Sequence, residues 1–195
     1  PADYGEYQRF EIKQKLGLPA ESRVVTFAAR LHPQKRPLDF IELARRFSGD
    51  PSIVFLMLGD GPLAVTVAEQ IARLKLTNTY RRPFYRPISD ILAITDVLVL
   101  PSEYEGMPLI VAETQMMGKP VVVTDVGNNR EVLELTGGGV VVPEIGDVGA
   151  LEAGVRRMLQ QPPDPAQTRR AVIDNYGVEV VSERYRKVLL GEPDA

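Results

Sequence analysis

The sequence predicts an α/β fold: a single Rossmann-like domain with a mostly parallel, six-stranded sheet and helices on both faces. Six short apolar runs alternate with helix-like segments, which is the order that successive βαβ units require. These runs are almost continuously apolar, as is typical of strands that are covered on both faces. With 195 residues, 44% of them hydrophobic and 25% charged, the chain has the size and composition of one soluble domain.

Five of the predicted strands are rich in valine, leucine and isoleucine, and the third is weaker. In chain order they lie at residues 24–29, 53–58, 79–84, 97–100, 121–124 and 140–142. Ligands of open α/β sheets bind outside the carboxyl ends of the strands, where helix N-termini present free N–H groups. The loops expected to carry a site are therefore residues 30–36, 59–62, 84–88, 101–108, 125–130 and 143–147.

Prolines mark the beginnings of three predicted helices, each shortly after a strand. Pro37, Pro62 and Pro108 can each occupy the first position of a helix, where a missing N–H costs nothing. The third of these helices is expected over residues 109–117, with Gly118 as its C-terminal cap.

The tail of the chain predicts two further helices, with the proline-rich residues 161–165 as the break between them. The apolar positions that define them are Leu151, Val155 and Leu159 in the first and Val178, Val181, Tyr185 and Val188 in the second. The acidic end, residues 191–195, is expected to fray.

Composition excludes several classes of function. The absence of cysteine rules out disulfides, thiolate metal sites and a cysteine nucleophile, and a lone His32 leaves little for a histidine metal site. A net charge of −3 argues against a dedicated nucleic-acid binder. The longest apolar runs have about six residues, far short of a transmembrane segment. Because the sequence starts at Pro1 and lacks a signal-peptide pattern, we expect a trimmed chain of cytoplasmic location.

The loop after the first strand carries Arg30 and Lys35 immediately before a helix. A guanidinium, an ammonium and a helix N-terminus can converge on one phosphate, although for this loop by itself solvated loop charges are the more ordinary explanation. We expect His32, between them, to be a surface residue.

The segment Gly59-Asp-Gly-Pro-Leu-Ala64 fits the G-x-G-x-x-A pattern of dinucleotide-binding loops. It follows the second strand rather than the first, and no acidic residue stands near the end of the next strand to hold a ribose. A tight turn into a helix is therefore the favoured interpretation.

Residues 101–113 hold the strongest chemical signal. Glu105 lies in the loop after a central strand, and Glu113 lies eight residues later, inside the predicted helix. Gly106 lets a ligand approach the backbone, and the N–H groups near Met107 and Leu109 can face it. This arrangement suits a polyol joined to a phosphate. The alternative is an exposed loop charge at Glu105 and a surface ion pair at Glu113.

The order and spacing of these motifs resemble the retaining glycosyltransferases of the GT-B fold, in family 4 or "group 1". Glu105 and Glu113 match the E-x7-E motif of that family. The other matching segments are Arg30 with Lys35 (G-R-x-x-x-x-K), 58–62 (G-D-G-P), 96–102, 118–127, Glu131 and 138–143. The resemblance covers roughly residues 11–160.

The resemblance implies that residues 1–195 form the C-terminal, nucleotide-sugar-binding domain, one half of a GT-B fold. The N-terminal domain, with most of the acceptor site, would be absent. The activity implied is transfer of a sugar from a nucleoside-diphosphate sugar to an acceptor with retention at the anomeric carbon, as in polysaccharide or glycoconjugate biosynthesis. By the same resemblance we expect no metal or other cofactor, and membrane attachment, if any, through the absent domain. The isolated chain is expected to bind nucleotide weakly and to transfer no sugar.

The same resemblance implies roles for particular residues. Arg30 and Lys35 would neutralise the diphosphate, and Glu113 would hold the ribose hydroxyls. The donor sugar would be held by Glu105, Gly106, Met107, Pro108 and Leu109. The base would lie against Tyr85, Arg86 and Pro87. The residues expected to take part in catalysis are Glu105, Arg30 and Lys35.

The sequence departs from the family pattern at three places. Ala29 replaces a common glycine, Tyr85 stands where glycine is common in the base loop, and Asn128-Asn129 follows Gly127. The ring of Tyr85 could stack on the base or narrow its pocket. Two other classes stay open: a nucleotide-binding or epimerase-like module without sugar transfer, and a doubly wound domain that binds a partner.

Overall fold

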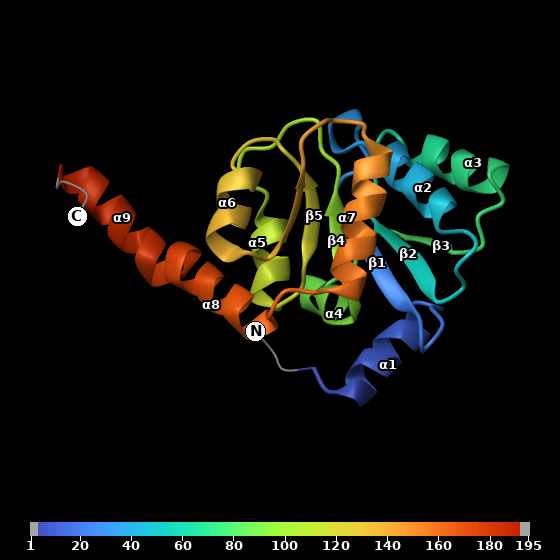
Figure 1. Cartoon of the computed structure of the whole chain (residues 1–195), viewed down its shortest axis with the longest axis horizontal. Helices are drawn as coiled ribbons and strands as arrows, with labels where there is room; N and C mark the ends of the chain where they lie inside the picture. The colour runs from blue at the N-terminus through green and yellow to red at the C-terminus, as the bar shows by residue number, and fades with distance from the viewer. Residues whose placement is uncertain (1–3, 192–195) are drawn as a thin grey trace.

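The computed structural model describes residues 4–191 and contains a six-stranded sheet in which every pairing is parallel (Figure 1). The strands are β1 (Arg23–Ala28), β2 (Ile53–Leu58), β3 (Thr79–Arg82), β4 (Val97–Leu100), β5 (Val121–Thr124) and β6 (Gly139–Val142). Their order is β3-β2-β1-β4-β5-β6. The chain therefore reverses direction across the sheet between β1 and β4, and a crevice at such a switch point is the usual ligand site of open α/β folds.

The helices follow the strands along the chain. They are α1 (Glu6–Lys15), η1 (Pro33–Lys35, a 3-10 helix), α2 (Pro37–Arg46), α3 (Ala64–Arg73), α4 (Ile88–Ile94), α5 (Leu109–Met116), α6 (Asn129–Thr136), α7 (Val148–Gln160), α8 (Pro165–Tyr176) and α9 (Val178–Leu190). The expected α/β class, with helices on both faces of one parallel sheet, is confirmed.

Alternate residues of the strands feed opposite faces of the sheet. In β2, Phe55 and Met57 join the core beneath α2, α3 and α7, whereas Leu56 and Leu58 join the core beneath α1 and α4. A third cluster lies between α5, α6 and strands β4 and β5. Because both faces are covered, β2, β4 and β5 are buried and apolar at nearly every position, whereas the edge strand β3 (Thr-Tyr-Arg-Arg) is only half-buried.

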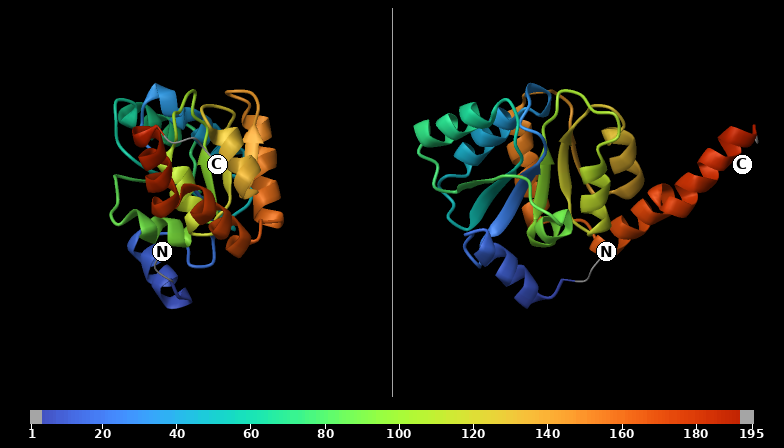
Figure 2. Two further views of the ribbon diagram at one scale, coloured as in Figure 1. Left: turned by 90° about the vertical axis from the view of Figure 1, so that its left-hand side faces the viewer. Right: turned by 180° about the vertical axis from the view of Figure 1, so that it is seen from behind.

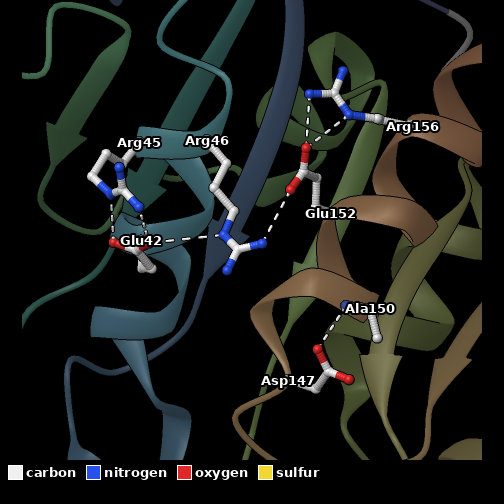
Figure 3. A network of polar contacts seen from close by, with 7 residues as sticks. All are labelled: Glu42, Arg45, Arg46, Asp147, Ala150, Glu152 and Arg156. Carbon is white, nitrogen blue, oxygen red and sulfur yellow. Dashed lines mark hydrogen bonds and ion pairs between the residues drawn. The ribbon is translucent and has the colours of Figure 1, made fainter.

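A surface network ties α2 to α7 across the first face (Figure 3). Arg46 lies 3.8 Å from Glu42 and 3.3 Å from Glu152, which also pairs with Arg156 at 2.8 Å. The hydrogen bond from Arg156 holds the pKa of Glu152 below its ordinary value. The Arg156 guanidinium also lies 4.3 Å from the centre of the Phe47 ring. Exposed pairs of this kind each contribute little stability, so the apolar contacts beneath them dominate.

The helices show where the sequence-based prediction was incomplete. Pro37 does begin α2, but α3 begins at Ala64 rather than at Pro62, and Pro108 precedes the first residue of α5. Helices α1, α4, α6 and α8 were not predicted. In α8, the side chain of Asp164 accepts hydrogen bonds from the N–H groups of Ala166 and Gln167, which follow Pro165, a start signal that the sequence does contain.

The last two helices extend away from the sheet (Figures 1 and 2). Helix α8 packs against α5 and α6, and α9 contacts α8. The predicted helix around residues 178–188 is present as α9, but its apolar residues are exposed; they include Val178, Tyr185, Val188, Leu189 and Leu190. Of the end expected to fray, residues 192–195 lie outside the described part of the chain. Within residues 4–191 no helix combines the length and apolar character that crossing a bilayer requires.

Candidate functional site

The predicted site residues gather at the carboxyl ends of the two strands where the sheet order reverses. Lys35 follows β1, and Glu105 follows β4, which pairs directly with β1. The Lys35 ammonium nitrogen lies 2.6 Å from Oε1 of Glu105. Only 6% of the Glu105 side chain and 21% of the Lys35 side chain is exposed. Glu105 is therefore a buried, paired carboxylate, and the alternative of an exposed loop charge is wrong.

Hydrogen bonds fasten the two loops to each other. The backbone N–H of Glu103 donates to the carbonyl of Gln34 at 2.7 Å, and the amide of Gln34 donates to the carbonyl of Tyr104 at 3.0 Å. Arg36 takes the left-handed conformation, with φ of 48°, and turns the chain from η1 into α2. The 30–36 and 101–108 loops thus form one unit, which fixes Lys35 against Glu105.

The loop after β5 closes the back of this unit. Gly127 has φ of +57°, and a side-chain carbon at this position would overlap the carbonyl oxygen of Glu105 and lie 2.5 Å from that of Gly106. The N–H of Asn128 donates to the carbonyl of Gly106 at 3.3 Å. The close approach requires glycine at position 127, so this residue supports the loop that carries Glu105.

The Gly59–Pro62 segment is a tight turn that supports the first loop. Gly59 and Gly61 have φ of 144° and 153°, and side chains at either would strike the backbone of residues 29–31. Leu31 donates its N–H to the carbonyl of Asp60 at 2.9 Å, and Leu63 donates to the carbonyl of Leu31 at 2.9 Å. The expectation of a tight turn is confirmed, and its role is to hold the loop that contains Arg30 and Lys35.

A cavity of about 880 Å³ lies at the same edge of the sheet, where the last residues of β1 and β2 reach it, but Arg30, Lys35 and Glu105 are not part of its lining. It is lined by Ala28, Leu58, Ile110, Glu113 and residues 84–88, so Tyr85, Arg86 and Pro87 share it with Glu113. Burial raises the pKa of the Glu113 carboxyl. The hydroxyl of Tyr85 lies 3.4 Å from Asp90, and Phe84 is largely exposed. The cavity thus combines apolar walls with one carboxylate, as a base and ribose require.

Several other predicted site residues are exposed. Arg30 is exposed, and its side chain makes no hydrogen bond or ion pair with the described residues. Met107 and Leu109 are also exposed, and Leu109 begins α5, whose first N–H groups lack partners within the helix. His32 accepts a hydrogen bond from the N–H of Gln34 at 3.3 Å, so its role in this structure is to cap η1.

Ser102 was not predicted as a site residue. This serine is fully buried and donates a 2.6 Å hydrogen bond to the same Oε1 of Glu105 that Lys35 contacts. A hydroxyl residue directly after a buried strand at the ligand-binding edge was a signal that could have identified it. No group of three or more acidic or histidine side chains within residues 4–191 is arranged to hold a metal ion.

Known proteins resemble both the sequence and the fold. The model of the family "Glycosyl transferases group 1" matches residues 8–176. UDP-Gal:alpha-D-GlcNAc-diphosphoundecaprenol alpha-1,3-galactosyltransferase of Escherichia coli is 35% identical over 71% of this chain and 37% of its own. 2-Deoxystreptamine N-acetyl-D-glucosaminyltransferase of Streptomyces fradiae is 29% identical over 90% of this chain and 45% of its own.

A solved structure of Anabaena HepE, in complex with UDP and glucose, has a TM-score of 0.85 and 21% identity. The match covers 95% of this chain and 52% of HepE, which shows the shared fold. The chain spans less than half the length of the two curated relatives described above. The family match over most of the chain, together with these relatives, shows that the chain belongs to the group 1 glycosyltransferases.

Proposed function

We propose that this chain is the nucleotide-sugar-binding domain of a retaining glycosyltransferase and that its donor is a UDP-sugar. The observation that carries the proposal is a cavity in which Glu113 meets the 84–88 loop, at the same edge of the sheet as the buried Lys35–Glu105 pair. The Escherichia coli relative is named for UDP-Gal, and HepE was solved with UDP and glucose, which supports uracil as the base.

Each part of the donor has a matching group in this proposal. The base lies along Tyr85, Arg86 and Pro87, and the ribose hydroxyls donate to Glu113. The diphosphate lies near Arg30, Lys35 and the beginning of α5. The sugar lies against Glu105 and the backbone of residues 106–109. An ammonium has three N–H donors, so Lys35 can keep its bond to Glu105 while it donates to a phosphate oxygen.

The chemistry follows from where charge develops. When the bond between the sugar and the diphosphate breaks, negative charge grows on the leaving diphosphate. Lys35, Arg30 and the free N–H groups at the start of α5 stabilise this charge more than they stabilise the ground state. Because these groups supply the positive charge, the proposed reaction uses no metal ion. Acceptor binding is assigned to a second domain, N-terminal to this one.

Calorimetric titration of the 195-residue chain with UDP, GDP and ADP tests the proposal. We expect selective binding of UDP. A hydrogen bond to a charged group contributes about 1.5–3 kcal/mol, so Lys35→Ala and Glu113→Ala should each weaken UDP binding about 10- to 100-fold. Lys119→Ala is the matched control, because Lys119 lies at the amino end of β5. No UDP binding up to about 10 mM, or binding that ignores both variants, would contradict the proposal.

A further inference from the structure

The two oxygens of the Glu105 carboxylate have unequal surroundings. Oε1 accepts two hydrogen bonds, one from Ser102 Oγ and one from Lys35 Nζ, both at 2.6 Å. Oε2 accepts none from the residues that the structure describes. Although only 6% of the Glu105 side chain is exposed, Oε2 is not one of the fully enclosed polar atoms that lack a partner, so a ligand can still reach it.

Ser102 has little freedom to do anything else. It is fully buried directly after β4, and its carbonyl accepts a 2.6 Å hydrogen bond from Thr124 Oγ1, itself buried at the end of β5. The next residue, Glu103, donates its N–H to Gln34 in the opposite loop. The backbone of Ser102 is therefore fastened to two neighbouring elements. Its hydroxyl has a single proton, and the contact with Glu105 uses it.

We propose that Ser102 is a positioning residue for the donor sugar. Its hydroxyl, with Lys35, occupies Oε1 of Glu105 and leaves Oε2 as the oxygen that accepts from a sugar hydroxyl. The inference rests on the proposed function of the site, because it assigns the sugar to Glu105. Ser102 itself does not touch the ligand.

This role has a consequence that a purely structural serine would not share. In the proposed site a nucleoside diphosphate contacts the base loop, Glu113, Arg30 and Lys35, but it lacks the donor sugar that Glu105 would hold. Loss of the Ser102 hydroxyl therefore weakens binding of a sugar nucleotide and leaves binding of the corresponding nucleoside diphosphate unchanged.

The experiment compares the dissociation constants of UDP and UDP-glucose for the 195-residue chain and its Ser102→Ala variant. We expect the wild type to bind UDP-glucose more tightly than UDP. In Ser102→Ala, UDP-glucose binding should weaken about tenfold, and UDP binding should change less than about twofold. Equal losses for both ligands would show a structural role and overturn the inference. An unchanged affinity of Ser102→Ala for UDP-glucose would also overturn the inference. So would a wild type that binds UDP-glucose no more tightly than UDP.

Two further variants separate positioning from stability. Ser22→Ala is the matched control: Ser22 is 4% exposed and donates a 2.7 Å hydrogen bond to the carbonyl of Pro19, before β1. It should lose stability without changing either affinity. In a Glu105→Ala background, Ser102→Ala should have no further effect on UDP-glucose binding. A sugar-specific loss in Ser22→Ala, or additive losses in the double variant, would overturn the inference.

The same data separate this inference from the proposed function. A wild type that binds neither UDP nor UDP-glucose contradicts the proposed function, and the role of Ser102 falls with it. A wild type that binds both, with parallel losses in Ser102→Ala, leaves the function standing and overturns only the positioning role.

Discussion

A partly buried lysine lies at each end of the parallel strands, Lys35 at their carboxyl ends and Lys119 at their amino ends, and the two differ in whether the charge is paired. At the carboxyl ends, Lys35 donates to Glu105 at 2.6 Å. At the amino ends, Lys119 forms no side-chain hydrogen bond or ion pair with the residues described. Burial, assisted by the positive charges of Arg9 and Lys13, lowers the pKa of Lys119 to about 8. Asp96 opposes that shift but does not cancel it.

The acidic groups at the two ends differ in what they contact. At the amino ends, Asp96 accepts a 2.7 Å hydrogen bond from the backbone N–H of Val24, so its carboxylate serves the fold. At the carboxyl ends, Glu105 keeps one oxygen free, and Glu113 faces the cavity. The contrast teaches that charge alone does not mark a site in this fold. What distinguishes the carboxyl ends of the strands is a buried lysine–glutamate pair that two hydrogen-bonded loops hold in place.

The largest expected effect comes from breaking the loop that backs the Lys35–Glu105 pair. Gly127→Ala places a side-chain carbon against the carbonyl oxygens of Glu105 and Gly106, in addition to the strain of its positive φ. Gly137, with φ of +62° and open space around it, provides the matched control. In urea unfolding, Gly137→Ala should cost about 1–2 kcal/mol and Gly127→Ala at least about 2 kcal/mol more. Equal costs would show that the contact with residues 105 and 106 is not tight.

A smaller effect on stability is expected from Lys119, at the amino end of β5. The folded pKa of Lys119, about 8, lies below its ordinary value of 10.5, so the unfolded state binds more protons between these values. Stability due to this group is therefore lowest below about pH 8 and rises as the pH increases toward 10.5. Lys119→Met should stabilise the protein by about 1–3 kcal/mol near pH 7 and remove that rise.

The measurement is urea unfolding of wild type and Lys119→Met at several pH values. Lys15→Met provides the control, since Lys15 is exposed at the end of α1. It should leave both the stability and its pH dependence nearly unchanged. If Lys119→Met were less stable than the wild type near neutral pH, the conclusion that the buried Lys119 charge is unpaired and destabilising would be wrong.

The smallest effect concerns the pH dependence of ligand binding at Glu113. Burial raises the pKa of this carboxyl. If the ionised carboxylate accepts the ribose hydroxyls, binding is strongest above the raised pKa and weakens as the pH falls through it. Uridine is the suitable ligand because it has no phosphate to titrate. NMR titrations between about pH 7 and pH 4 should show this loss in the wild type and a flatter profile in Glu113→Gln. Identical profiles would remove Glu113 from the ribose site.

The sequence was most informative where burial is complete. The run at residues 53–58 coincides with β2, because a strand buried on both faces must be apolar throughout. Helix α4 was missed because its seven residues include the four consecutive buried positions 91–94, which show no helical period. In α1, only Ile12 is fully buried, which leaves too few apolar positions to define a face.

The site was predicted in outline because loop order follows from strand order. Lys35 and Glu105 leave adjacent parallel strands, so their meeting could be inferred from the motifs. The place of Ser102 at this edge could also be inferred, but its hydrogen bond to one particular oxygen of Glu105 could not, because that contact depends on a rotamer and on a 2.6 Å approach. Lys119 was overlooked because a lysine between Gly118 and Pro120 is typical of a solvated turn. Only the structure shows that it is partly buried.

A crystal structure of the chain with bound UDP-glucose would test most directly whether the donor site lies at the carboxyl ends of the strands. We predict the uracil against residues 84–88, the ribose within hydrogen-bonding distance of Glu113, and the diphosphate beside Lys35. A nucleotide bound instead at the turn formed by residues 59–62, with Glu113 and Lys35 making no contact to it, would contradict the proposed donor site.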